Sequence, residues 1–121
     1  MKWYKLFGSA EEARVKVPLM RVVSVLIKAE NRRVFLARTP AGFYAADDVC
    51  PHLNVQLSKG VCTTYNEITC PWHAYRFSLQ TGAETTGQDC GPLTLHPLRE
   101  DAEGFFIGIG PASELHAGEA E

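Results

Sequence analysis

The sequence predicts an all-β protein, built as a sandwich or a small barrel. Its 121 residues fit one domain with a single core. Short runs rich in Val, Ile, Leu and Phe are separated by turns, for which the chain supplies 10 Gly and 7 Pro. No internal repeat or low-complexity tract interrupts this pattern. We therefore expect several short strands and little helix.

The N-terminal segment predicts one strand and one helical turn. Lys2–Phe7 alternates enough for a first strand. Ser9–Glu12 has the spacing of a capping box, in which Ser and Glu side chains satisfy the first backbone N–H groups of a helix. Val15–Val17 is a short apolar stretch that ends at Pro18.

Two hairpins are expected next. Met20–Ala29 is rich in Val, Leu and Ile, and Arg33–Arg38 alternates apolar and basic residues, so these segments pair across residues 30–32. The Thr-Pro-Ala-Gly sequence at 39–42 predicts a turn, after which Phe43–Ala46 forms a strand. Further along, Gly60 and the Tyr-Asn-Glu sequence at 65–67 suit a turn, and Ile68-Thr69 a returning strand.

Four residues carry the functional signal. Cys50 and His52 form Cys-Pro-His, and Cys70 and His73 form Cys-Pro-Trp-His, with 17 residues from 53 to 69 between the motifs. Each motif offers one thiolate and one imidazole. A two-iron two-sulfur cluster with histidines on one iron needs two Cys on one iron and two His on the other. The ligand pairs would therefore form across the two loops.

The residues around these ligands favour stiff, extended loops. Residues i and i+2 of an extended segment point to the same side, so Cys50 and His52 can face neighbouring metal atoms. Pro51 and Pro71 follow the two cysteines. Proline fixes its own φ and drives the preceding residue away from the helical region. Both cysteines are therefore expected in non-helical loops.

Two alternatives compete with a cluster. Zinc also takes four Cys and His ligands, but common zinc signatures pair like ligands, whereas each motif here is mixed. The four residues could also be unrelated, since an interior Cys often packs as a small hydrophobe. Four coincidences at this spacing are the least economical explanation.

The spacing Cys-x-His, 17 residues, Cys-x-x-His resembles the cluster-binding motif of Rieske proteins. The likeness to this family covers residues 3–109, although only the ligand motifs are specific to it. The resemblance implies one 2Fe-2S cluster and a three-sheet β fold with a cluster-binding subdomain at about residues 46–80. It also implies one Rieske domain over residues 1–110, with a flexible acidic tail at 111–121, and a loop at 88–93 that covers the cluster.

The resemblance further implies a one-electron carrier without substrate chemistry. All cluster positions are filled by protein ligands, so no site stays open for a substrate. His52 and His73 would lie near the surface and serve as the exit route for the electron. Four apolar residues could surround them as a docking rim: Leu53, Val55, Trp72 and Pro92.

Several positions depart from the family pattern. Ala74 stands where a glycine usually follows the second histidine, and its Cβ would resist a left-handed backbone by about 1–2 kcal/mol. Tyr75 and Phe77 match the Ser and Tyr that hydrogen-bond the cluster sulfurs in high-potential members. Phe77 cannot donate a hydrogen bond, so we expect a potential toward the low end of roughly −150 to +300 mV. Val55 and Trp72 replace the disulfide cysteines of the membrane-complex branch.

Targeting signals, cysteines and charge indicate the protein's location and its kind of partner. No signal-peptide pattern and no run of 18 apolar residues occurs, so we expect a cytoplasmic protein without a membrane span. Cys62 and Cys90 are expected to be free thiols, and neither His96 nor His116 is placed to bind the cluster. Residues 1–40 carry nine Lys or Arg and three Asp or Glu, against three and eleven from 41 onward, where Asp47 and Asp48 stand just before Cys50 as expected surface charges. Nucleic acid is therefore an unsuitable partner, and an oppositely charged redox protein suits the acidic half.

Two uses in different classes follow. The first is a ferredoxin that passes electrons from a flavin-dependent reductase to a terminal oxidoreductase, such as a ring-hydroxylating oxygenase. The second is a Rieske subunit of a larger enzyme, such as NAD(P)H nitrite reductase. Such subunits commonly lack the cluster ligands, whereas this chain keeps all four, which favours the carrier.

Overall fold

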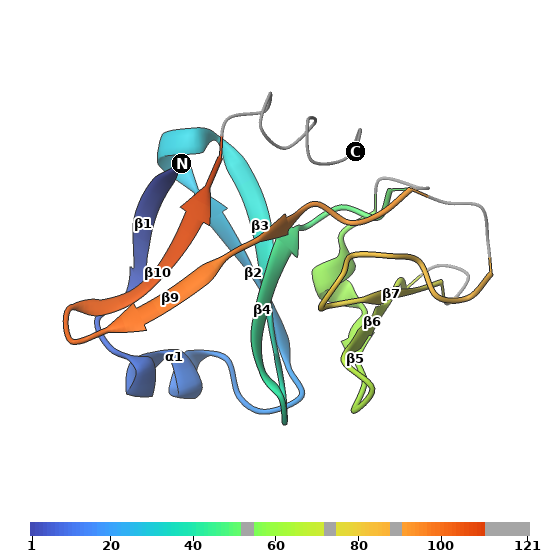
Figure 1. Ribbon diagram of the computed structural model, residues 1–121, viewed down its shortest axis with the longest axis horizontal. Coiled ribbons are helices and arrows are strands. Elements are labelled where there is room, and N and C mark those ends of the chain that lie inside the picture. Colours follow the sequence, from blue (N-terminus) through green and yellow to red (C-terminus); the bar gives the residue numbers. More distant parts are fainter. Residues whose placement is uncertain (52–54, 72–74, 88–90, 111–121) are drawn as a thin grey trace.

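Three antiparallel sheets build the molecule, as the all-β prediction required (Figure 1). A computed structural model describes residues 1–51, 55–71, 75–87 and 91–110. The sheets have strand orders β1-β10-β9, β2-β3-β4-β8 and β5-β6-β7. The elements are β1 (Lys2–Phe7), α1 (Ala10–Lys16), β2 (Val22–Ile27), η1 (Lys28–Glu30), β3 (Arg32–Thr39), β4 (Gly42–Asp47), η2 (Leu57–Lys59), β5 (Val61–Cys62), β6 (Glu67–Thr69), β7 (Arg76–Ser78), β8 (Leu95–His96), β9 (Leu98–Asp101) and β10 (Gly104–Ile109).

The N-terminal predictions are confirmed, with one extension. Strand β1 has the expected bounds and pairs with the distant β10. The Ser9 Oγ accepts a hydrogen bond from the Glu12 N–H at 3.0 Å, while Glu12 Oε1 accepts from the N–H of Gly8 at 2.7 Å. The helix continues to Lys16 and so includes Val15, because Ala13 is fully buried and anchors a second turn.

Both predicted hairpins form. Val22 pairs with Ala37 and Ile27 with Arg32, so β2 pairs over its full length with the first six residues of β3. The short η1 turn joins them, ending at Asn31 in the left-handed region at φ 48°. Asparagine tolerates this conformation better than most residues. The second hairpin turns at residues 39–42, and β4 then leads towards the first cysteine.

Strand β3 lies in the middle layer and buries both faces. Val34 and Leu36 pack into one core with Ile107 and other residues of the β1-β10-β9 sheet. Phe35 and Ala37 point to the opposite core, which sheet β5-β6-β7 completes. Such two-sided burial explains the continuous Val-Phe-Leu-Ala sequence of this strand. The second core contains the cysteine-bearing loops.

Sheet β5-β6-β7 carries the second cysteine segment. It is a compact meander, at the right of Figure 1, in which Cys62 pairs with Ile68 and Ile68 with Phe77. Asn66 takes the left-handed conformation at φ 58° in the turn before β6, as the turn prediction for residues 65–67 suggested. The strand at β6 ends at Thr69, one residue before Cys70.

The α1 helix of seven residues is too short to cross a membrane, and no other helix of the described segments could do so.

Candidate metal centre

Both predicted cysteine ligands lie in loops that follow strands, and both are buried. Cys50 follows β4, and Cys70 follows β6. Their exposed fractions are 0% and 1%, yet the prolines next to them, Pro51 and Pro71, are exposed. Each chain segment therefore turns outward from a buried sulfur immediately after the cysteine.

The two cysteine loops are closed in the same way. The Cys50 N–H donates to the Val55 carbonyl at 2.8 Å, and the Cys70 N–H donates to the Tyr75 carbonyl at 2.7 Å. In both cases the acceptor is five residues further along the chain. Two loops of different sequence thus share one backbone closure, which fixes both ends of each ligand-bearing segment.

The structure brings the two loops to the same core. Cys50 and Cys70 belong to one buried cluster with Leu57, Ile68 and Phe77, between the middle sheet and sheet β5-β6-β7. Two buried thiols from separate loops, surrounded by apolar side chains, are the donor set that one iron of a sulfur cluster requires. The residues present therefore fit such a group at its cysteine end.

His52 and His73 lie outside the described residues, so the structure does not test the imidazole end of the site. Among residues 1–51, 55–71, 75–87 and 91–110, no three Cys, His, Asp or Glu side chains gather as metal ligands. The four-residue ligand set of Cys50, His52, Cys70 and His73 thus stays a prediction.

Some of the remaining predicted positions lie within the described residues, and others lie outside them. Phe77 is fully buried in the core that holds both cysteines, Tyr75 is half-buried, and Leu93 lies in the same core. Of the predicted docking rim, Val55 is half-buried and Pro92 is exposed. Further predictions fall outside the described residues: Leu53 and Trp72 of the rim, Ala74, residues 88–90 with Cys90, and the tail at 111–121 with His116.

A buried carboxylate missed by the sequence analysis fastens the first loop. Asp48 is only 6% exposed. It accepts hydrogen bonds from the Ser58 N–H at 2.7 Å and the Ser58 hydroxyl at 2.6 Å. These bonds connect the residue two before Cys50 to the η2 turn. The sequence offered one signal for this contact: Asp48 stands just before the first ligand motif, and Ser58 lies in the Leu-Ser-Lys-Gly segment at 57–60 that follows it.

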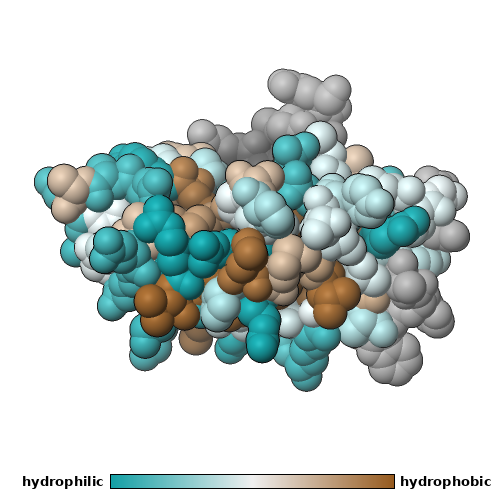
Figure 2. All heavy atoms as spheres, turned by 90° about the horizontal axis from the view of Figure 1, so that it is seen from below, coloured by the Kyte–Doolittle hydropathy of each residue, from teal (hydrophilic) through white to brown (hydrophobic). Residues whose placement is uncertain are grey.

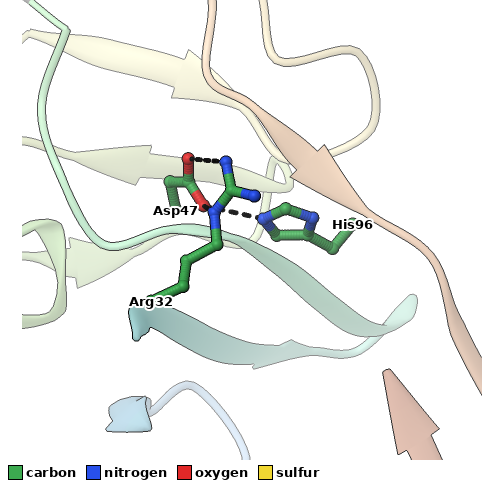
Figure 3. Close-up of polar contacts among 3 residues, drawn as sticks. All are labelled: Arg32, Asp47 and His96. Atoms are coloured by element: carbon green, nitrogen blue, oxygen red, sulfur yellow. Dashed lines mark hydrogen bonds and ion pairs between the residues drawn. The ribbon is translucent and has the colours of Figure 1, made fainter. Parts of the chain in front are cut away.

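A second carboxylate joins three strands where the first loop begins (Figure 3). Asp47 receives two hydrogen bonds from Arg32, at 2.9 and 3.0 Å, and one from His96 Nε2 at 2.8 Å. Because a carboxylate only accepts hydrogen bonds, His96 donates from Nε2. The other ring nitrogen, Nδ1, is buried without a hydrogen-bond partner among the described residues. Neither Asp47 nor Asp48 is therefore a free surface charge for docking, which corrects our interpretation of this acidic pair.

The Asp47 network predicts a loss of stability in acid. Burial raises the pKa of Asp47, but the hydrogen bonds and charges of His96 and Arg32 lower it by more, so the net pKa is lowered. A lowered folded-state pKa gives stability that is complete above the unfolded value, about 3.9, and is lost as pH falls through the folded value. We expect Asp47→Asn to cost roughly 1–2 kcal/mol at pH 7, since the group is partly exposed.

Urea unfolding of the wild type and of Asp47→Asn, measured between pH 7 and pH 2, checks this. The difference between the two midpoints should shrink below about pH 4, as the wild-type carboxylate protonates. A difference that stays constant down to pH 2 would show that the charge of Asp47 contributes nothing.

Cys62 is a buried thiol outside both motifs, as expected. It is 6% exposed, and its Sγ donates to the Arg38 carbonyl at 3.7 Å. Burial raises the pKa of Cys62. Because the thiolate is the reactive form, we expect iodoacetamide to label Cys62 at least about tenfold more slowly in the folded protein than in urea. Mass spectrometry of a Cys90→Ser background resolves this site; equal labelling rates in both states would contradict the burial.

Comparisons with known proteins identify the family of this chain. The profile of the Rieske [2Fe-2S] domain matches residues 3–97. The ferredoxin subunit of 3-phenylpropionate/cinnamic acid dioxygenase from Shigella boydii is 34% identical over 70 residues, which are 58% of this chain and 66% of the relative. The chain thus spans slightly less than two thirds of the length of that relative.

Solved structures share the fold. The ferredoxin of carbazole 1,9a-dioxygenase from Nocardioides aromaticivorans has a TM-score of 0.75 at 20% identity, covering 91% of this chain and all of that chain (100%). A chain from a complex of reduced oxygenase and oxidised ferredoxin of carbazole 1,9a-dioxygenase has a TM-score of 0.72 at 21% identity, with coverages of 88% and 92%. A candidate NADH-dependent nitrite reductase small subunit from Mycobacterium tuberculosis has a TM-score of 0.73 at 19% identity, with coverages of 91% and 97%.

At these identities the structures establish the fold alone, whereas the domain profile establishes the family. The match covers well over half of the chain. The alternatives of a structural zinc module and of four unrelated residues are accordingly set aside. Two buried cysteines in equivalent loops, a three-sheet fold and the domain match lead to one conclusion: the chain belongs to the Rieske [2Fe-2S] domain family, whose cofactor is a two-iron two-sulfur cluster.

Proposed function

We propose that the protein is a one-electron carrier of the ferredoxin type. In this proposal Cys50 and Cys70 hold one iron and His52 and His73 the other. The observation that carries it is the meeting of Cys50 and Cys70 in one buried core, from two loops with equivalent backbone closures. When bound, the cluster would accept and release single electrons.

The chain's own residues would keep the cysteine end dry and rigid. Cys50 and Cys70 are excluded from solvent, and the surrounding core raises the cost of moving either sulfur. Asp48 and Ser58 fasten the start of the first loop, while Thr69 in β6 positions the second. A site held on strands in this way changes little in shape between redox states, which favours fast electron transfer.

We propose a flavin-dependent reductase as the donor and a ring-hydroxylating oxygenase as the acceptor, with the protein acting in the cytoplasm. The named relative is a dioxygenase ferredoxin subunit, and one matched structure is a complex of an oxygenase with its ferredoxin. We also propose that residues 1–110 form one domain, that residues 46–80 form the cluster-binding subdomain, and that residues 111–121 form a flexible acidic tail.

Metal analysis and a reductase assay test this function. Freshly purified, coloured protein should contain iron and acid-labile sulfide in equal amounts and no stoichiometric zinc. With NADH and a flavin-dependent ferredoxin reductase, its visible spectrum should bleach, and a ring-hydroxylating oxygenase should restore it. Protein that folds but stays colourless after anaerobic reconstitution with iron and sulfide would exclude an electron carrier.

A second candidate is the Rieske subunit of a larger enzyme such as NAD(P)H nitrite reductase. The fold match to the nitrite reductase small subunit, with a TM-score of 0.73, favours it. The four ligand residues favour the carrier. Co-purification from the native host separates the two: a stable complex with a large flavoprotein that contains sirohaem would support the subunit and exclude the free carrier.

The reduction potential should lie low in the Rieske range, and Phe77→Tyr should raise it. Phe77 is fully buried in the core that contains both cysteines and has no hydrogen-bond donor. A tyrosine hydroxyl that stabilises the reduced cluster by about 1 kcal/mol more than the oxidised one would raise the potential by roughly 40 mV for one electron. Redox titration followed by visible absorption checks this, with Phe35→Tyr as the control for an added hydroxyl in the same core. A shift of equal size in both variants would show that the position of the hydroxyl does not matter.

A further inference from the structure

A groove of about 560 Å³ lies in the base of the molecule, between α1, the β3–β4 turn and the β9–β10 hairpin. Its apolar surface includes Phe43, Phe105 and Leu98. The two phenylalanine rings meet edge to face, with centroids 5.0 Å apart. Leu19 also lines the groove and is 53% exposed. The volume is that of a binding cleft, and the lining offers hydrophobic contact.

Two arginines line this groove without a carboxylate partner among the described residues. Arg38 is held in place, because its Nη1 donates to the Arg14 carbonyl at 3.1 Å and its guanidinium lies 5.5 Å from the Phe43 ring centre. Arg14 is exposed, and its side chain has no ion pair in the described segments. Glu100 is the one acid among the described lining residues. Arg14 and Arg38 therefore bring uncompensated positive charge to an apolar groove.

Arg99 also lines the groove, but unlike Arg14 and Arg38 it has a carboxylate partner in the described part of the chain. Arg99 lies 3.5 Å from the Asp101 carboxylate and stacks on Trp3 and Phe106, at 4.7 and 4.9 Å from their ring centres. Arg14 and Arg38 have no such carboxylate. The guanidinium fork binds carboxylates with two parallel hydrogen bonds, so the missing component of the groove is an acidic group.

The groove lies at the far end of β4 from the first cysteine loop. Gly42 begins the strand and lines the groove, while Asp47 ends it, three residues before Cys50. Five residue steps of extended chain span about 17 Å. In Figure 1 the β3–β4 turn and α1 both lie at the lower side, whereas β4 runs upward towards the loop that bears Cys50. An occupant of the groove would leave that loop uncovered.

We propose that this groove docks an acidic segment of a partner protein, in which carboxylates alternate with large apolar side chains. Carboxylates would bind Arg14 and Arg38, and an apolar side chain would pack on Phe43 and Phe105. The surface around it has the same mixed character: Figure 2, which views this lower side, shows separate hydrophobic residues among hydrophilic ones. Arginine and aromatic residues are the types enriched in protein interfaces.

A protein segment fits better than a small free anion. The groove is broadly open to solvent, whereas small-molecule sites enclose roughly 70–90% of the ligand to gain affinity. Next to the groove, Val15 is 75% exposed on α1. A segment longer than the groove could cover this residue as well. The contact would add a second attachment point that is independent of the cluster and so goes beyond electron transfer.

Fluorescence anisotropy with the cluster-loaded protein tests the proposal. The probe is a fluorescein-labelled twelve-residue peptide with the repeated sequence Glu-Phe-Glu-Leu. One control peptide replaces Glu by Gln, and another replaces Phe and Leu by Ser. The probe should bind, both controls should bind at least tenfold more weakly, and added salt should weaken the binding.

Variants of the protein locate the site. Arg14→Gln removes a charge without removing a side-chain hydrogen bond or ion pair within the described segments, and it should weaken probe binding about tenfold, equal to 1.4 kcal/mol. Lys28→Gln makes an equal charge change directly after β2, outside the groove lining, and should leave the affinity for the probe unchanged. Arg38→Gln should also weaken binding, but it removes the hydrogen bond to α1 as well. Equal probe affinity in the wild type and Arg14→Gln would overturn the proposal.

Two further outcomes would assign another occupant and likewise overturn it. If deletion of residues 111–121 strengthens probe binding tenfold, the chain's own acidic tail fills the groove. If benzoate displaces the probe at concentrations comparable to the probe's dissociation constant, the groove binds small anions. Bleaching by the reductase should remain normal in Arg14→Gln, so failure of this proposal is distinguishable from failure of the electron-carrier proposal.

Discussion

Replacing Cys70 with alanine is expected to abolish cluster binding. Cys70 is 1% exposed and shares a hydrophobic core with Cys50. If these two thiolates hold one iron, the loss of either leaves that iron with an incomplete ligand set, and no other described Cys side chain can replace it without moving a strand. Purified Cys70→Ala should therefore be colourless, with iron and sulfide below about a tenth of the wild-type content by colorimetric analysis.

Cys62→Ala is the matched control for this loss. Cys62 is buried in the same core and has the same side chain, but its thiol donates to the Arg38 carbonyl. The substitution should cost about 1 kcal/mol of stability and leave the iron content unchanged. If Cys62→Ala also loses its iron, or if Cys70→Ala retains it, the assignment of Cys50 and Cys70 as the cysteine ligands is wrong.

The local elements of the fold could be predicted because their signals are short-range. The capping box at Ser9 and the turn at residues 39–42 both act within a few residues, and both form as expected. The length of α1 could not be predicted in this way. It depends on the burial of Ala13 beneath distant strands, a tertiary effect that outweighs the β-propensity of Val15.

The candidate site was predictable in its chemistry but not in its supports. The residue types and spacing of the motifs predicted Cys50 and Cys70 as ligands, because few cofactors require that donor set, and the structure places both cysteines in one core. Asp47 and Asp48 looked like surface charges in the sequence. Their hydrogen bonds come from Arg32, His96 and Ser58, in three other segments, and such long-range polar contacts leave no local pattern.

The groove lined by Arg14 and Arg38 could not be predicted from the sequence either. Arg14 belongs to α1, Arg38 to β3, and Phe105 to β10. The sequence showed only that the first 40 residues are basic. The fold decides which of these charges receive a carboxylate partner, as Arg32 does, and which do not.

Gly60→Ala is expected to destabilise the protein severely and to impair cluster binding. A Cβ on Gly60 would lie 1.9 Å from the backbone oxygen of Thr69 and 3.3 Å from that of Leu57. Neither oxygen can rotate away as a side chain could, so β5 and β6 must separate where Val61 pairs with Thr69. Overpacking of this kind costs about 3 kcal/mol or more. Because Thr69 precedes Cys70, the same displacement would move a proposed iron ligand.

Thermal unfolding and iron analysis of Gly60→Ala check both effects. Gly8→Ala is the matched control outside the proposed site, since a Cβ at Gly8 would meet only the flexible Glu12 side chain, with Oε1 at an ordinary contact distance of 3.7 Å. The control should stay within about 0.5 kcal/mol of the wild type and keep its iron. A Gly60→Ala protein as stable as the control would mean that β5 and β6 do not approach as closely as described. A Gly60→Ala protein that is unstable but fully loaded with iron would separate the strand contact from the position of Cys70, and would show that the cysteine loop adjusts independently of β6.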